Sequence, residues 1–235
     1  MTAADLAKRL PGIPTVRALS RSYAVLDAIL SPDGSPTYTF DAHWAAGEEL
    51  AAMTTGSGDE YSIVFTRAGA FIRGFDHESP MSPYRDDDTY ATWPGLVESV
   101  PREFASQIDE PAFCHHVPTG KVLAATVCLW RLHDDPAWRC GDIAYPREGG
   151  LADPDGSGWM FAMLADATPE GYRAYAEDFF EVSLDPAAIR EVFEHRPLTA
   201  DLVRRINPEA DLAALEETLE TIGYPPGSPD REAGL

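Results

Sequence analysis

The stretch from Glu48 to Pro83 constrains the fold most, because it contains three short apolar runs separated by two turn sequences. The first turn is Gly56-Ser57-Gly58-Asp59, and the second is centred on Ala68-Gly69. Glycine accepts the positive φ angles that hairpin turns require, so each turn predicts a chain reversal. The sequence thus predicts an antiparallel meander, with Ile63 and Phe65 on one face because alternate strand residues share a side. The predicted strands are Leu50–Met53, Tyr61–Phe65 and Phe71–Phe75.

Helical patterns lie on both sides of this meander. Upstream, apolar residues recur at spacings of three and four, which is typical of an amphipathic helix; they are Val16, Leu19, Tyr23, Leu26 and Leu30. Downstream, Thr168-Pro169, Asp185-Pro186 and Thr199 are helix-start sequences, and Gly223 closes a last helix. The predicted fold class is therefore α+β, an antiparallel sheet with N-terminal helices and a C-terminal helical region packed on it.

The same patterns predict how the chain divides. Residues 1–166 are expected to form the sheet-containing domain, residues 167–223 a helical region on the same core, and residues 224–235 a frayed tail. Within the first part, the apolar run Val122–Leu132 predicts one buried strand, and Trp159–Leu164 predicts another short strand. Between them, Asp153-Pro154-Asp155-Gly156-Ser157-Gly158 is interpreted as a turn, since the oxygen ligands that would complete a calcium loop do not follow.

Charge limits the classes of partner. The formal net charge is −21, which makes binding to a nucleic-acid backbone unfavourable and attracts a basic protein instead. No apolar run approaches the ~18 residues of a membrane span, and the N-terminus lacks the apolar core of a signal peptide, so a cytoplasmic protein is expected. Its three cysteines are an odd number for an unexported chain, which favours free thiols over disulfides.

The candidate binding residues are seven carboxylates and one histidine, which lie in the loops of the meander and shortly after it. Asp76, His77 and Glu78 follow the third strand, and Asp59 and Glu60 lie at the first turn. Consecutive side chains diverge in an extended strand, so a bend after Phe75 is needed to bring them together. The densest acidic run completes the set with Asp86, Asp87 and Asp88. No metal ligands, cofactor or catalytic residues are assigned, because Cys114-His115-His116 and the other cysteines lack the spacing of a zinc site.

The segment GSGDEYSIVF, the glycine turn after it and GAFIRGFDHES resemble the central hairpin of SMI1/KNR4-like (SUKH) proteins. In that superfamily a glycine-rich turn precedes one strand, and a later strand ends in a D-H-E-like loop. The resemblance covers Gly56–Ser79. Many members resemble bacterial immunity proteins, so it implies a bacterial protein that neutralises a partner toxin by binding it.

Three functions remain open from the sequence. The leading hypothesis is a non-enzymatic binding protein, immunity-like, whose acidic face covers a basic partner such as a toxin. The second is a metal-dependent hydrolase that uses the Asp76-His77-Glu78 loop together with Asp59 or Glu60. The third is a scaffold or regulatory domain whose acidity only maintains solubility.

Overall fold

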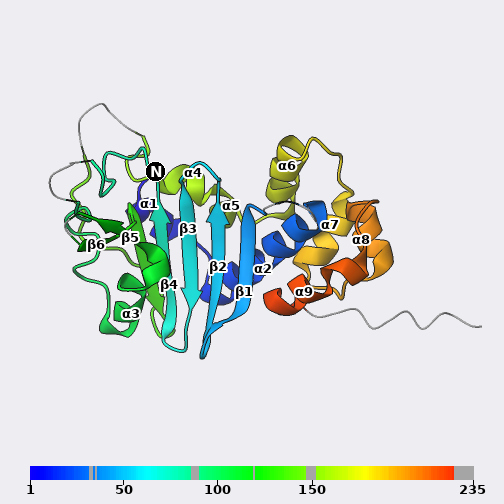
Figure 1. Cartoon of the computed structure of the whole chain (residues 1–235), viewed down its shortest axis with the longest axis horizontal. Coiled ribbons are helices and arrows are strands. Elements are labelled where there is room, and N and C mark those ends of the chain that lie inside the picture. The colour runs from blue at the N-terminus through cyan, green and yellow to red at the C-terminus, as the bar shows by residue number, and fades with distance from the viewer. Residues whose placement is uncertain (32–33, 35, 86–89, 119, 147–151, 225–235) are drawn as a thin grey trace, which may run out of the picture. The chain divides into compact units, whose positions relative to one another are not determined.

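The computed structural model describes the chain except for residues 32–33, 35, 86–89, 119, 147–151 and 225–235 (Figure 1). The α-helices are α1 (Ala3–Arg9), α2 (Ile13–Leu30), α3 (Ala105–Ile108), α4 (Ser157–Met160), α5 (Ala162–Asp166), α6 (Pro169–Phe179), α7 (Pro186–Phe193), α8 (Ala200–Ile206) and α9 (Glu216–Ile222). The strands are β1 (Tyr38–Ala45), β2 (Glu48–Thr54), β3 (Glu60–Phe65), β4 (Gly69–Phe75), β5 (Cys114–Val117), β6 (Gly120–Leu123) and β7 (Val127–Leu132). Short 3₁₀ helices are η1 (Arg102–Phe104), η2 (Pro111–Phe113) and η4 (Leu212–Leu215).

The main sheet has five strands in the order β1-β2-β3-β4-β7, and β5 pairs with β6 in a separate two-stranded sheet. β3 pairs antiparallel with β4, and Ile63 lies opposite Ile72 in that ladder. β4 also pairs antiparallel with β7. The predicted α+β class and the meander of three neighbouring strands are confirmed, and the strand alternation puts Ile63 and Phe65 on one face.

The chain divides into two compact units that alternate along the sequence. The first unit contains Met1–Ile13 and Ala52–Ala165, and the second contains Pro14–Ala51 and Asp166–Leu235. One boundary between the units falls after Ala51, inside β2, which is the first strand of the predicted meander.

In the first unit, β4 is buried along its whole length. On one face, the ring of Phe161 stacks on Tyr61 at 4.8 Å between ring centroids. On the other face, the ring of Phe104 lies 6.0 Å from that of Phe71. Both faces of the sheet at β4 are therefore covered by side chains of the same unit, which explains the nearly continuous apolar sequence of this strand.

The second unit is built on α2, whose apolar stripe is buried as the spacing predicts except for the half-buried Leu30 at its end. Tyr23 on this helix stacks on Tyr172 of α6 at 5.5 Å. The start residues found in the sequence are the caps of the helices: Thr168 caps α6, Asp185 caps α7 and Thr199 caps α8. Gly223 closes α9 in a left-handed conformation with φ of 66°, where glycine is favoured.

The prediction of one strand over Val122–Leu132 is wrong, because the run is divided between β6 of the small sheet and β7 of the main sheet. The carbonyl of Ala124 accepts a hydrogen bond from the buried guanidinium of Arg73 at 2.8 Å. The hydroxyl of Thr126 donates to the carbonyl of Asp155 at 2.8 Å. Polar groups within this apolar run are therefore hydrogen-bonded to a side chain of β4 and to the loop that contains Asp155. Apolar periodicity alone does not predict these hydrogen bonds.

The predicted strand at Trp159–Leu164 is also wrong, because this segment contains α4 and the start of α5. Asp153 accepts hydrogen bonds from the backbone N–H groups of Gly158 and Trp159 at 2.9 and 3.0 Å. A carboxylate that binds the free N–H groups of a first turn favours a helix. None of the helices in the described part of the chain has the length and apolarity of a membrane span, and all three cysteines are free thiols.

Candidate functional site

A sharp bend after β4 carries the acidic loop. The backbone N–H of Asp76 donates to the hydroxyl of Thr126 at 3.1 Å, which ends the sheet ladder. The Asp76 carboxylate then accepts from the N–H of Glu78 at 3.0 Å, and its carbonyl accepts from Ser79 at 3.2 Å. An aspartate that binds the backbone two residues on closes a turn. The bend that the sequence requires is therefore supplied by Asp76 itself.

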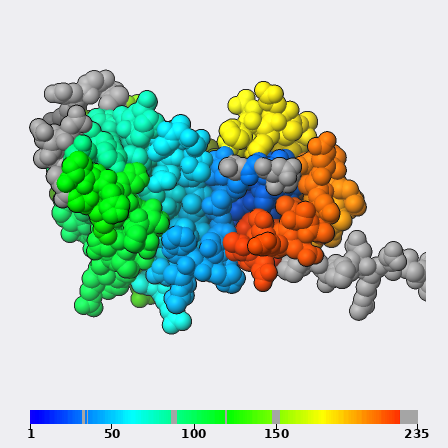
Figure 2. Space-filling model, viewed as in Figure 1, coloured from blue at the N-terminus to red at the C-terminus, as the bar shows by residue number. Residues whose placement is uncertain are grey.

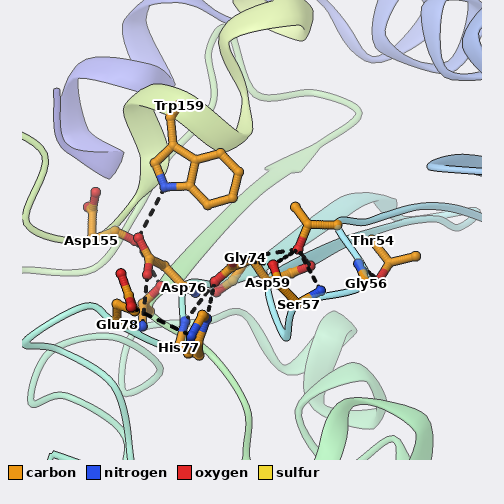
Figure 3. A network of polar contacts seen from close by, with 12 residues as sticks. Thr54, Gly56, Ser57, Asp59, Gly74, Asp76, His77, Glu78, Asp155 and Trp159 are labelled. Carbon is orange, nitrogen blue, oxygen red and sulfur yellow. Dashed lines mark hydrogen bonds and ion pairs between the residues drawn. The ribbon is translucent and has the colours of Figure 1, made fainter. Parts of the chain in front are cut away.

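His77 and Asp59 form the closest ionisable pair of the loop (Figure 3). Nδ1 of His77 lies 2.7 Å from Oδ1 of Asp59, and the same oxygen accepts from the His77 backbone N–H at 3.0 Å. Gly58 lies under the ring, because a Cβ at this glycine would lie 3.6 Å from its atoms and its φ is 111°. The turn before β3 thus positions a carboxylate that holds both the ring and the backbone of His77.

The pKa values of this pair shift in opposite directions. The hydrogen bond to Asp59 raises the pKa of His77, against a smaller effect of burial, and the charges of Asp59, Glu78 and Asp76 raise it further. For Asp59, burial is the largest single influence and would raise the pKa, but the bonds and charge of His77 outweigh it and the pKa is lowered. The pair therefore favours a charged imidazolium beside a carboxylate.

A second loop, residues 153–159, closes the other side of the site. The indole Nε1–H of Trp159 donates to Oδ2 of Asp76 at 3.1 Å (Figure 3). A Cβ at Gly156 would lie 2.5 Å from the same oxygen, and its φ of 78° also favours glycine. The hydroxyl of Ser79 donates to the carbonyl of Pro154 at 2.7 Å. The two loops are thus joined by side-chain hydrogen bonds and by a close approach that only glycine permits.

Together these loops form a pocket of about 230 Å³, called here the acidic pocket. Its lining combines four carboxylates with an indole and a proline ring. The lining residues are Asp59, Asp76, Glu78, Ser79, Pro80, Asp153 and Trp159. No lysine or arginine occurs among these described lining residues. Trp159 is 45% exposed, so part of its ring is accessible to a ligand.

Buried Asp155 lies behind the pocket in the second loop. Its carboxylate accepts from the N–H of Ala3 at 2.7 Å and from the N–H of Ser157 at 3.0 Å. Burial raises its pKa, and the hydrogen bonds with Ser157 and Ala3 offset only part of that effect. Asp155 therefore anchors the start of α1 and the second loop, which keeps the pocket wall in place.

The predicted binding residues fall into three groups. Asp59, Asp76, His77 and Glu78 come together at the bend. The structure places Glu60 elsewhere, because its carboxylate pairs with Arg73 at 2.7 Å. Asp86, Asp87 and Asp88 lie outside the described residues.

Sequence reasoning missed Trp159 and Asp153, which lie more than seventy residues beyond the acidic loop. The sequence Asp153–Gly158 predicted a turn, and the only sequence indication of a binding role was that a tryptophan, a residue type common in binding sites, follows this turn directly.

Among the described residues, no group of three or more His, Cys, Asp or Glu side chains is arranged to hold a metal ion. This includes the described cysteines and the Cys114-His115-His116 segment. Comparison of the chain with family models, curated proteins and solved structures finds no match.

Proposed function

We propose that this protein binds a basic protein partner and that the acidic pocket receives a lysine or arginine side chain of that partner. The observation that carries the proposal is the lining of the pocket, which sets four carboxylates beside the accessible ring of Trp159. Carboxylates form strong charge-assisted hydrogen bonds with guanidinium groups, and an indole face attracts a cation. The net charge of −21 adds long-range attraction that raises the association rate.

The specific form of the proposal is an immunity-like protein that neutralises a basic toxin. Its support is an overlap: Gly56–Ser79, the residues that resemble SMI1/KNR4-like proteins, include Asp59, Asp76 and Glu78 of the pocket. A toxin whose basic side chain is bound in such a pocket can no longer use that side chain to bind another ligand.

A first experiment tests the pocket without a known partner. The indole N–H resonance of Trp159, identified by its loss in Trp159→Phe, reports directly on the bond to Asp76. We expect it to shift when acetyl-glycyl-arginyl-glycine amide is added, and to stay in place with the matched peptide that carries neutral citrulline. An indole resonance that is unmoved by the arginine peptide, or moved equally by both peptides, excludes a cation-binding pocket.

A second experiment tests the partner class. Proteins encoded beside this gene are purified and titrated against the wild type and pocket variants by calorimetry. Trp159→Ala should weaken binding by about tenfold, since a desolvated cation over an indole contributes ~1–2 kcal/mol. Glu78→Gln should weaken it less, and Glu220→Gln, an exposed change on α9, should leave it unchanged. Absence of binding to every neighbouring gene product leaves the immunity-like form without support.

The Asp59–His77 pair favours one other candidate, a hydrolase in which His77 is a general acid or base. An imidazole oriented by a carboxylate is a common catalytic arrangement. Metal analysis of the purified protein, followed by hydrolysis assays of the wild type and His77→Ala, separates the two candidates. Turnover that His77→Ala abolishes, or one tightly held metal that it releases, would replace the binding proposal.

A further inference from the structure

The C-terminal end of α6 exposes large apolar side chains in the second unit. Phe179 is 59% exposed and Val182 is 41% exposed. Among the described residues, Trp159 is the other large apolar side chain with comparable exposure. Figure 2 shows the atoms of α6, coloured yellow, at the surface of the molecule. Phe179, Phe180 and Val182 are called here the α6-end patch. Neighbouring exposed apolar side chains of this size mark interaction surfaces.

The patch arises because the apolar stripe of α6 continues beyond the core of the unit. Tyr172 and Ala176 on this helix are buried. Tyr175 stacks on Phe179 at 5.5 Å, and Phe179 meets Phe180 edge-on at 5.0 Å. The helix ends there, and the chain turns at Glu181, whose φ is 54°. Residues other than glycine seldom adopt this backbone conformation. The outermost aromatic ring of the stripe is therefore left open to solvent.

A groove of about 420 Å³ begins at this patch. Phe180 and Val182 belong to its lining, and the other apolar lining residues come from the end of α2 and from α8 and the segment after it. The full lining is Leu30, Phe180, Val182, Ser183, Ile206, Asn207, Pro208 and Glu209. The groove is concave and about half apolar in its lining, and the patch adds exposed apolar side chains at its edge. Peptide-binding surfaces combine apolar and polar contacts in this way.

The charges around the patch select the kind of occupant. Asp178 and Glu181 flank the two phenylalanines in the sequence and are exposed, and exposed Glu209 lines the groove. The described groove lining has no lysine or arginine. A second copy of this chain would bring the same acidic rim and a further charge of −21, so electrostatic repulsion opposes self-association here. A basic partner meets no such penalty.

We propose that the α6-end patch and its groove bind a short segment of a partner protein in which apolar side chains alternate with lysine or arginine. Apolar side chains of the segment occupy the groove beside Phe180 and cover Phe179, while its cations face Asp178, Glu181 and Glu209. This surface extends the proposed binding function to the second unit, but it does not depend on the acidic pocket. Experiments can therefore disprove binding at one surface and still support binding at the other.

The test uses the full chain and three labelled peptides of equal length, read by fluorescence anisotropy at 0.15 M salt, where the Debye length is about 8 Å. One peptide alternates leucine with lysine, one serine with lysine, and one leucine with glutamate. We expect the leucine–lysine peptide to bind more tightly than the other two. Phe179→Ser should weaken its binding at least about tenfold, as expected for loss of a buried aromatic ring. Val182→Thr should weaken it by a smaller factor.

Two control variants separate this proposal from the pocket. Ala174→Ser changes an exposed position of the same helix and should leave the leucine–lysine affinity unchanged. Trp159→Ala changes the acidic pocket and should also leave the leucine–lysine affinity unchanged. Equal binding of the serine–lysine peptide, or leucine–lysine binding that Phe179→Ser does not weaken, overturns the proposal. A concentration-dependent dimer that Phe179→Ser abolishes also overturns it, since the occupant would then be a second copy.

Discussion

Asp27 in the second unit and Asp59 in the first unit are both largely withdrawn from solvent, yet their pKa values shift in opposite directions from the ordinary value of an aspartate. Asp27 is completely buried, and its carboxylate accepts from the hydroxyl of Tyr172 at 2.7 Å and from the N–H of Tyr38 at 2.9 Å. Burial raises its pKa to about 6, and these neutral donors offset only part of the effect. The side chain of Asp59 is 12% exposed and contacts an imidazole, and its pKa is lowered.

The two carboxylates differ both in burial and in the charge that their donors can carry, since Asp27 is completely buried and the side chain of Asp59 is 12% exposed. Both carboxylates accept bonds from a backbone N–H and from a side chain. Only the partner of Asp59 can carry a positive charge, and a positive charge compensates for the lost hydration of a carboxylate. Asp27 is consequently a structural group inside its unit, whereas Asp59 holds a charged residue at the rim of a pocket.

The largest difference between the two is expected in stability. Asp27→Ala leaves the Tyr172 hydroxyl and the Tyr38 N–H without their acceptor inside the core, so the free energy of unfolding should fall by about 3 kcal/mol. Asp59→Ala affects groups that water reaches, and we expect a fall of about 1 kcal/mol or less. Urea unfolding followed by circular dichroism measures both. Equal losses for the two variants would show that Asp27 contributes no more to stability than Asp59.

A second prediction concerns pH. The folded pKa of Asp27, about 6, exceeds the ordinary value of 3.8, so the folded state binds this proton more tightly. The resulting stabilisation is complete below pH 3.8 and is lost as the pH rises through 6. Between pH 4.5 and 7.5 it should fall by about 2 kcal/mol.

The measurement is the difference between the wild type and Asp27→Asn across that pH range, since the amide does not titrate and other groups cancel. The pH dependence that Asp59 contributes has the opposite sign. Because the pKa of Asp59 is lowered in the folded state, this residue stabilises the fold at pH values above its ordinary pKa, and the stabilisation is lost as the pH falls. A wild-type curve that runs parallel to that of Asp27→Asn would contradict the raised pKa.

The third prediction tests the charged partner itself. If the hydrogen bond that the His77 ring donates to Asp59 is the main reason for the raised pKa of His77, Asp59→Asn should lower that pKa toward its ordinary value. Titration of the imidazole ring protons by NMR measures the change. Asp27→Asn, in the other unit, is the matched control and should leave the His77 titration unchanged. A raised pKa that persists in Asp59→Asn would assign the shift to the surrounding carboxylates instead.

Much of the fold was predictable because its determinants are local. The helix caps Thr168, Asp185 and Thr199 act within one turn of their own position, and the glycine turns of the meander specify reversals in the same way. The acidic loop was also found, since its residues are consecutive. Apolar runs without such markers were misread, as the helical segment after Gly156 shows.

The rest of the site depends on contacts between residues far apart in the sequence. Nothing local indicates that Trp159 donates to Asp76, or that Glu60 pairs with Arg73 instead of joining the pocket. Asp27 looks like one polar residue on an amphipathic helix, and only the packed structure shows it to be buried beneath Tyr172. Such pairings are set by tertiary packing, which a single sequence does not display.

The smallest expected effect on the pKa of His77 comes from Glu78, because its substitution removes a nearby charge without removing a hydrogen bond. Glu78 is 85% exposed, and its carboxylate lies 4.0 Å from Nε2 of His77. Its charge raises the pKa of His77, but it follows the Asp59 bond in size. Glu78→Gln should therefore lower the His77 pKa less than Asp59→Asn does, because a solvated charge acts through a high dielectric.

Salt then distinguishes the two carboxylates, since at 1 M the Debye length falls to about 3 Å and screens an exposed charge at this separation. In NMR titrations the difference between wild type and Glu78→Gln should disappear at high salt, while the effect of Asp59→Asn should remain because direct contact excludes screening ions. Equal salt sensitivity of the two variants would mean that the Asp59–His77 pair is as open to solvent as Glu78. The distinction between the contacting charge of Asp59 and the solvated charge of Glu78 would then not hold.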